Sequence, residues 1–364
     1  MWIASLQFFS FRNLVDAEVN TSARDVFLVG ENGQGKTNFL EAVYFSSYAS
    51  SFRSANDRDL VKDGKGPSVV IAKRVSEEGG NGKTTVKIEN GKKSVVIDGK
   101  KVDDRKELLS VMPCIVFCHE DMAFATGAPE NRRWFFDQTQ SLYDPLYLDD
   151  LRNFRKILKT RNNILKESPD FAILDAIDSQ LAFYGVNIMK KRTESARLFS
   201  EIFAPLYEQV SGISNIQIRY VPSWKDGIGD DAGEVVEFLK TKRENDAAFG
   251  ATLSGPHRDR YLFTHDGVEF ARNASTGQRR LLALLLRVVQ ARRFLFVTAK
   301  KPILLLDDVL LELDPEKRRR FLESIPEYNQ AFYTFLPEEP YERYGKGDTM
   351  VYQVADGRFQ REGL

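Results

Sequence analysis

The sequence predicts an α/β fold in two parts. One is a head built on a mixed sheet with attached antiparallel strands, and the other is a helical lobe with a short antiparallel coiled-coil hairpin. Three observations predict it. A glycine-rich loop stands between an apolar strand and a helix at residues 26–45, and a second apolar strand ends in two aspartates at residues 303–308. Between them, two apolar stripes with helical spacing flank a tight turn at residues 151–188.

Composition sets only broad limits. The 364 residues include 52 Lys and Arg and 52 Asp and Glu, so net charge neither favours nor excludes nucleic acid. Arg287 interrupts the longest apolar run below the roughly 20 residues that span a bilayer, and MWIASLQFFSFRN lacks the features of a signal peptide. We therefore expect a cytoplasmic protein with no membrane partner. Cys114 and Cys118 lie in the apolar segment MPCIVFC, which favours buried thiols over a metal site.

The glycine-rich loop has the pattern of a phosphate-binding loop. Gly30-x4-Gly35-Lys36-Thr37 follows the strand 26–29 and precedes a helical segment. Glycines let backbone N–H groups turn toward phosphate oxygens, and the helix dipole adds favourable potential. We expect Lys36 to reach the β and γ phosphates of ATP and Thr37 to bind Mg²⁺. The predicted contacts are Gly30, Glu31, Asn32, Gly33, Gln34, Gly35, Lys36, Thr37 and Asn38.

A second strand ends in carboxylates. In KKPILLLDDVLLELD, an apolar run precedes Asp307 and Asp308, which places both acids at the carboxyl edge of a parallel sheet, where ligands bind. We expect Asp307 to hold Mg²⁺ with Thr37, and Asp308 to orient and polarise the attacking water. The alternative is that the two acids cap the next helix. About 270 residues separate the two motifs, which leaves room for an inserted element.

The intervening residues predict that element. PSVVIAKRV, KTTVKIEN and KSVVID indicate antiparallel strands attached to the head. Two helical arms then follow, each about 28 residues and so about 40 Å long, joined by the SPD turn at residues 168–170 and broken by Arg161 and Lys191. We expect a head of residues 1–125 and 254–364 and a helical lobe of residues 126–253. The arm stripes comprise Leu151, Phe154, Leu158 and Leu165, then Leu174, Ile177, Leu181, Tyr184 and Ile188.

A polar loop precedes a very apolar helix in STGQRRLLALLLRVV. Ser275 is a favourable N-cap, yet Arg279 and Arg280 occupy the first turn, where acids are normally preferred. A P-loop ATPase interrupted by helices, with this loop, has the layout of an ABC-type ATPase head. In that class the loop closes over ATP held by a second copy, so Ser275, Gly277 and Gln278 are further predicted ATP contacts. The two arginines would either add to the phosphate contact or pair with surface acids.

In particular, the sequence resembles the RecF family, which belongs to the ABC-type, SMC-like ATPases. The resemblance implies homodimers that form on double-stranded DNA when ATP binds, and a weak DNA-stimulated ATPase. The protein would recognise the structure of the DNA rather than its sequence. The resemblance also implies work with RecR and RecO to load RecA at gaps during recombinational repair. It runs, in order, through FSFRN, GENGQGKTNFLEAVYF, SSFRS, GAPENRRWFFD, LKTRNNILK, QLAFYG, SGPHRD, STGQRR and LLLDDVLLELD.

Several positions depart from the usual RecF motifs. Leu311 replaces a Ser before Glu-Leu-Asp, and Arg260 replaces an Asp after GPHRD. Thr276 and Arg279 replace two glutamines, and Phe335 stands where polar residues are usual. The changes at 311 and 335 concern the dimer interface and the sensing of the γ-phosphate, so they bear on the hydrolysis rate.

Basic residues on the arms are candidates for DNA phosphate contacts. From the residues alone, a solvated helix face balanced by Asp149, Asp150 and Glu167 is the favoured explanation, and the resemblance reverses that preference. The candidates are Arg152, Arg155, Lys156, Lys159, Arg161, Lys190, Lys191, Arg192 and Arg197.

Two other ABC-type classes share the nucleotide motifs. The ATPase subunit of a transporter would carry a histidine in the segment QAFYTFLPEE, which has none. An SMC-like structural clamp would need hundreds of coiled-coil residues, far more than these arms supply.

Overall fold

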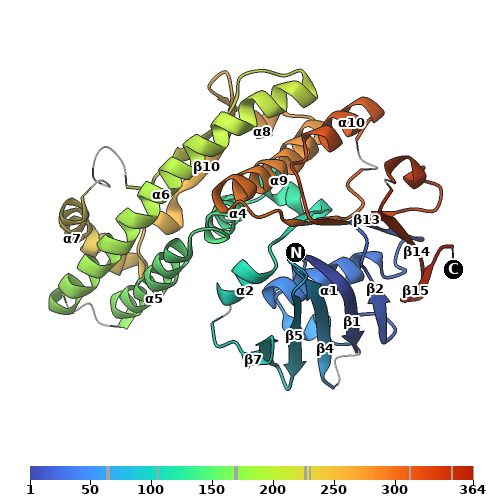
Figure 1. The fold of residues 1–364 in the computed structure, drawn as a ribbon. Coiled ribbons are helices and arrows are strands. Elements are labelled where there is room, and N and C mark those ends of the chain that lie inside the picture. The colour runs from blue at the N-terminus through green and yellow to red at the C-terminus, as the bar shows by residue number, and fades with distance from the viewer. Residues whose placement is uncertain are drawn as a thin grey trace. The chain divides into compact units, whose positions relative to one another are not determined.

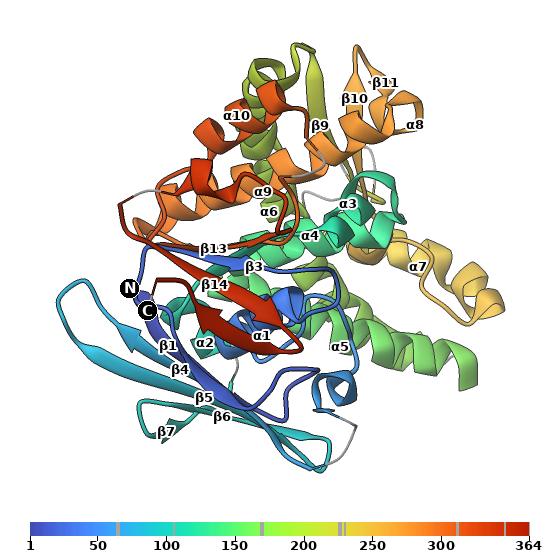
Figure 2. The ribbon, with the colours of Figure 1, turned by 90° about the vertical axis from the view of Figure 1, so that its right-hand side faces the viewer.

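The computed structural model describes residues 1–62, 66–104, 106–167, 171–224, 228, 231–310, 313–345 and 347–363. The chain divides into two compact units, each described by itself: a first unit of residues 1–121 and 290–364, and a second unit of residues 122–289. The second boundary differs from the expected one near residue 254. The reason is that β10 (Arg260–His265), labelled in Figure 1, pairs along its whole length with β9 (Ile216–Val221), so this strand stays with the second unit (Figure 2 labels both).

The first unit contains a mostly parallel sheet of order β15-β14-β3-β13-β12-β8. All residues of β3, β13, β12 and β8 are buried, as expected for strands covered on both faces. Only β15 runs antiparallel to its neighbour. The bounds are β3 (Asp25–Val29), β8 (Cys114–Phe117), β12 (Ile303–Leu306), β13 (Gln330–Phe335), β14 (Thr349–Ala355) and β15 (Arg358–Arg361). The predicted buried strands are therefore present.

A second, antiparallel sheet of the first unit has the order β2-β1-β4-β5-β6-β7. The predicted strands between residues 60 and 110 form β4 to β6, whereas β1 and β2 were not predicted. Helix α1 (Lys36–Tyr48) packs between the two sheets and contacts β4, β5, β8 and β13 (Figure 2). The antiparallel strands are β1 (Trp2–Phe9), β2 (Ala17–Asn20), β4 (Ser68–Val75), β5 (Asn81–Glu89), β6 (Lys92–Ile97) and β7 (Lys100–Lys101).

Short helices complete the first unit. Across the described ranges, no helix combines the length and apolar character needed to cross a membrane. The elements are η1 (Asp57–Leu60), α2 (Lys106–Val111), η3 (His119–Asp121), α10 (Pro315–Ser324) and η5 (Tyr341–Tyr344).

The second unit contains the predicted helical pair, α5 (Pro145–Glu167) and α6 (Phe171–Ser211), which pack against each other. A third helix, α7 (Ala232–Phe249), packs on both, so the pair is not a two-helix coiled coil alone. The predicted SPD turn at 168–170 lies outside the described residues. The other elements are α3 (Met122–Thr126), α4 (Pro129–Ser141), η4 (Pro256–Arg258), β11 (Val268–Glu269), α8 (Phe270–Asn273) and α9 (Thr276–Thr298), whose last residues belong to the first unit.

Arg161 interrupts the apolar stripe as predicted, but the structure corrects its place among the predicted DNA contacts. Its side chain is fully buried, and Nε donates to Oδ1 of Asp178 at 2.7 Å. Nη1 donates to Asp246 at 2.7 Å and to Thr252 at 2.8 Å. Arg243 donates to the same Asp178 carboxylate. This ion cluster joins α5, α6 and α7 at the position where the apolar stripe is interrupted.

Arg192 is also buried, which corrects its place among the predicted DNA contacts. Its guanidinium donates to Asp137 at 2.9 Å and to Asp259 at 2.7 Å. The hydroxyl of Tyr147 donates to Asp137 at 2.6 Å, and that of Tyr220 donates to Asp259. The closing aspartates of the motifs GAPENRRWFFD and SGPHRD therefore belong to one internal ion cluster of the second unit.

Replacing Arg161 should destabilise the second unit strongly. Arg161→Met keeps the length of the side chain but leaves Asp178 and Asp246 buried with less compensating charge. We expect a loss of about 3–5 kcal/mol in the free energy of unfolding. Arg155→Met, on the exposed face of the same helix, should change it by less than about 0.5 kcal/mol. Urea unfolding followed by circular dichroism measures both, and equal effects would contradict a structural role for Arg161.

Candidate nucleotide site

The backbone of the P-loop requires glycine at specific positions. A Cβ at Gly30 would lie 2.3 Å from the carbonyl oxygen of Val354, and Gly33 and Gly35 have φ values of +80° and +115°. Gly35 is the N-cap of α1, so the first N–H groups of a buried helix open onto the loop. The Lys36 ammonium folds over this loop and donates to the carbonyls of Gly30 and Glu31.

Neighbouring segments brace the loop from outside the motif. The N–H groups of Asp356 and Gly357, in the turn between β14 and β15, donate to the side chain and the carbonyl of Gln34 at 2.7 and 2.9 Å. Asn13 donates to the carbonyl of Gly33 at 3.1 Å and accepts from Asn38 at 2.7 Å. The predicted contact residues Gln34 and Asn38 thus have structural partners as well.

The ion pair between Arg12 and Glu41 was not predicted from the sequence. Arg12 forms two hydrogen bonds of 2.7 and 2.9 Å with the carboxylate of Glu41, which is fully buried in α1. Ser51 donates to the same carboxylate, and Arg53 donates to Asn38 at 3.0 Å. The segments FSFRN and SSFRS, found only through the resemblance, therefore hold the first turns of α1.

The two aspartates lie beside the P-loop, as predicted. The Thr37 hydroxyl donates to Oδ1 of Asp307 at 2.9 Å. The Thr334 hydroxyl lies between the carboxylates, 3.1 Å from Asp307 and 2.8 Å from Asp308, and it accepts the N–H of Asp308. Burial raises the pKa of Asp307 to about 6, and the adjacent Asp308 contributes to the rise. A nearby cation would stabilise the charged form of the buried Asp307 carboxylate and offset its repulsion with Asp308.

The donor set suits a hard cation. Hydroxyl and carboxylate oxygens, as in Thr37 and Asp307, are Mg²⁺ ligands. Within the part of the chain that the structure describes, no cluster of three or more His, Cys, Asp or Glu side chains could hold a metal ion alone. Phosphate oxygens commonly complete the coordination of a Mg²⁺ ion that protein oxygens hold.

The segment after β13 differs from a polar sensor loop. Phe335 is fully buried, its ring stacks on those of Tyr333 and Tyr344, and its carbonyl accepts the N–H of Gly30 at 3.1 Å. Glu339 is buried too and accepts the N–H of Leu336 at 2.7 Å, and burial raises its pKa. Residue 335 thus supports the P-loop from its backbone. Leu311, the other departure that concerns hydrolysis, lies outside the described residues.

The loop at residue 275 begins α9 with a capping box. The N–H of Ser275 donates to the side-chain oxygen of Gln278 at 2.7 Å, and the N–H of Gln278 donates to the Ser275 hydroxyl at 3.2 Å. A Cβ at Gly277 would meet nothing within 4 Å, so this turn is open to approach. Arg280 is only 2% exposed, so its side chain points away from the open turn. This loop belongs to the second unit, whereas the P-loop belongs to the first.

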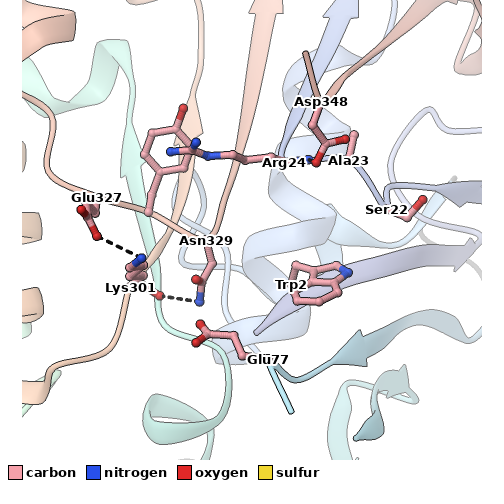
Figure 3. A pocket seen from close by; sticks show the side chains of 10 residues that line it. Trp2, Ser22, Ala23, Arg24, Glu77, Lys301, Glu327, Asn329 and Asp348 are labelled. Carbon is pink, nitrogen blue, oxygen red and sulfur yellow. Dashed lines mark hydrogen bonds and ion pairs between the residues drawn. The ribbon is translucent and has the colours of Figure 1, made fainter. Parts of the chain in front are cut away.

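A separate cavity of about 480 Å³ lies at the opposite, amino-terminal ends of the parallel strands (Figure 3). Lys301 pairs with Glu327 at 2.9 Å, and Glu77 pairs with the N-terminal amine. Arg24 stacks over the ring of Tyr328. The cavity lacks the excess positive charge that a triphosphate requires, so it is not the nucleotide site.

Comparison with known proteins gives the family. A family model described as the RecF/RecN/SMC N terminal domain matches residues 2–356. A DNA replication and repair protein RecF from Treponema pallidum (strain Nichols) is 44% identical over 350 residues, covering 96% of this chain and 98% of the relative. The chain belongs to the RecF family. A RecF of Clostridium botulinum (strain 657 / Type Ba4) is 31% identical over 366 residues, covering 99% and 100%.

Solved structures agree with the fold prediction. A structure of the recombination mediator protein RecF with ATP, in the RecFOR pathway, has a TM-score of 0.90 at 26% identity and covers 99% of this chain and 97% of that one. An Smc head domain from Pyrococcus furiosus has a TM-score of 0.57 at 15% identity, which concerns the fold alone. The predicted ABC-type head with a helical lobe is confirmed, and the transporter alternative is not favoured.

Proposed function

We propose that this chain is an ATP-dependent DNA-binding protein of recombinational repair. The observation that carries the proposal is the hydrogen bond between Thr37 and Asp307, because it joins the P-loop to the carboxylate strand in a RecF-family chain. We infer that ATP binds at the P-loop, and that Lys36 turns from the carbonyls it now contacts to the β and γ phosphates. Mg²⁺, held by Thr37 and Asp307, would supply charge neutralisation at these phosphates.

Hydrolysis would depend on Asp308. Its carboxylate accepts from Thr334, and its backbone N–H donates back to the same hydroxyl, so the side chain is held beside Asp307. From there it would orient and polarise the attacking water. We propose weak, DNA-stimulated turnover, in which ATP chiefly controls assembly.

We propose that Ser275, Gly277 and Gln278 contact ATP bound to a second copy of the chain. Ser275 and Gly277 are exposed, and the open turn at Gly277 lets a phosphate approach the first N–H groups of α9. A homodimer would then contain two composite sites. By the family relationship we extend the proposal to work with RecR and RecO in loading RecA at gaps.

The DNA surface that we propose is one face of α5. Its basic residues recur at helical spacing over about 20 Å, all are exposed, and they lie opposite the buried stripe. Arg152 pairs with Asp149, while the other four form no salt bridge with any described residue. Lys191 and Arg197 on α6 are paired with acids. The face comprises Arg152, Arg155, Lys156, Lys159 and Lys166.

Substitution of Asp307 and substitution of Asp308 should affect different steps, the first ATP binding and the second hydrolysis. Asp308→Asn should bind ATP and Mg²⁺ but hydrolyse at least about 100-fold more slowly and accumulate the dimer, because only the water-orienting charge is lost. Asp307→Asn should weaken Mg²⁺-dependent ATP binding, because a cation ligand is lost. Calorimetry with and without Mg²⁺, together with phosphate release, separates the two. Identical behaviour would contradict the division of roles.

Removing charge from α5 should weaken binding to duplex DNA irrespective of its sequence. Arg155→Gln, Lys156→Gln and Lys159→Gln together should lower the log–log salt slope by about 2–3. The matched control, Lys191→Gln, Arg197→Gln and Lys240→Gln, removes three charges that are already ion-paired. Fluorescence anisotropy between low and physiological salt measures both. A control that loses as much affinity as the test variant would exclude a specific contact by α5.

Ser275→Arg should abolish dimerisation while the monomer still binds ATP. Loss of the cap should cost only about 1 kcal/mol of stability, whereas a long side chain obstructs the approach of the partner's phosphate. Mixing this variant with Lys36→Ala, which should not bind ATP tightly, leaves one complete composite site per hybrid dimer. Light scattering and turnover should therefore recover partially in the mixture. Loss of ATP binding by monomeric Ser275→Arg would instead place the loop in its own chain's site.

A further inference from the structure

A cavity of about 430 Å³ within the second unit is markedly basic. Its walls come from the end of α3, the first turn of α4, β10, α8 and the first turn of α9. Four arginines and one glutamate line it, a difference of three positive charges. These residues are Arg132, Arg260, Arg272, Arg279 and Glu269.

Arg132 anchors the cavity. It is only 8% exposed, and its three guanidinium nitrogens donate to the carbonyls of Phe124, Tyr261 and Ala125 at 3.1, 3.0 and 2.9 Å. These bonds fix the plane of the guanidinium. The helix α4 starts beside it at Ala128, whose side chain caps none of the free N–H groups, so the helix dipole adds positive potential.

The single acid cannot neutralise the cavity. Glu269 pairs with Arg272 at 2.8 Å and with Arg132 at 3.7 Å. Arg260 and Arg279 form no salt bridge with any described residue, although Arg279 donates to the carbonyl of Arg272 at 3.2 Å.

We propose that this cavity holds a backbone phosphate of duplex DNA, an inference that rests on the DNA binding proposed above. Guanidinium groups match phosphate oxygens with paired hydrogen bonds. Arg260 is exposed and Arg272 is 81% exposed, so the phosphate of a polymer reaches the cavity from its mouth. Arg279 directly follows Gln278 of the capping box. A phosphate held here therefore contacts the same helical turn that is proposed to meet the partner's ATP.

The test removes the two uncompensated charges. Arg260→Gln with Arg279→Gln should lower duplex affinity about 10-fold near physiological salt and reduce the log–log salt slope by about 2. The control, Arg197→Gln with Lys240→Gln, removes two ion-paired charges of the same unit and should change affinity less than about 2-fold. Unchanged affinity in the test variant, with duplex binding intact in the unaltered protein, overturns this inference alone.

A second variant acts in the opposite direction. Glu269→Gln removes the one acid among the described residues that line the cavity. Duplex affinity should therefore rise severalfold and the salt slope should steepen, results that a damaged fold does not produce. Inorganic pyrophosphate, titrated by calorimetry, tests whether the cavity binds a free phosphate anion instead of a phosphate of DNA. If the double arginine variant loses pyrophosphate binding but keeps its duplex affinity, the cavity is a small-anion site and the inference fails. Absence of duplex binding by the unaltered protein would overturn the proposed function together with this inference.

Discussion

The hydrogen bond between Thr37 and Asp307 joins residues that lie 270 positions apart, and the two ends of the chain must build its framework together. β3 from the N-terminal part pairs on one side with β13 and on the other with β14, both from the C-terminal part. The P-loop and the aspartates therefore exist as a site only when this parallel sheet forms. The long middle segment costs little to insert, because the entropy of closing a loop grows slowly with its length.

The nucleotide motifs could be predicted because their requirements are local. Only glycine can follow the path at residues 30 and 35, and strands buried on both faces are recognisable as apolar runs. The roles of Arg161 and Arg192 could not be predicted, because helical spacing identifies a face but not what covers it. α7 brings Asp246 against Arg161, and Asp259, just before β10, lies against Arg192. Such partners are set by tertiary packing, which a one-dimensional pattern does not contain.

The motifs that were most specific to the family turn out to serve packing as much as chemistry. Asp137 and Asp259, in two of the most recognisable segments, form ion pairs with the buried Arg192. Arg12 likewise forms an ion pair with the buried Glu41 of α1. A buried charge must be paired, because an unpaired one costs several kcal/mol. Substitution of either partner should therefore lower the stability of the fold. A residue that is characteristic of the family need not contact a ligand.

The two arginines at the start of α9 differ in their surroundings. Ser275 and Gln278 already satisfy one another's N–H groups, so capping does not require the arginines that follow. Arg280 is buried, whereas Arg279 faces a cavity that already contains three other arginines. The helix dipole makes this end of α9 positive, and Glu269 is the one carboxylate among the described residues that line that cavity. Positive charges gathered in this way repel one another, and an anion from another molecule would offset that repulsion.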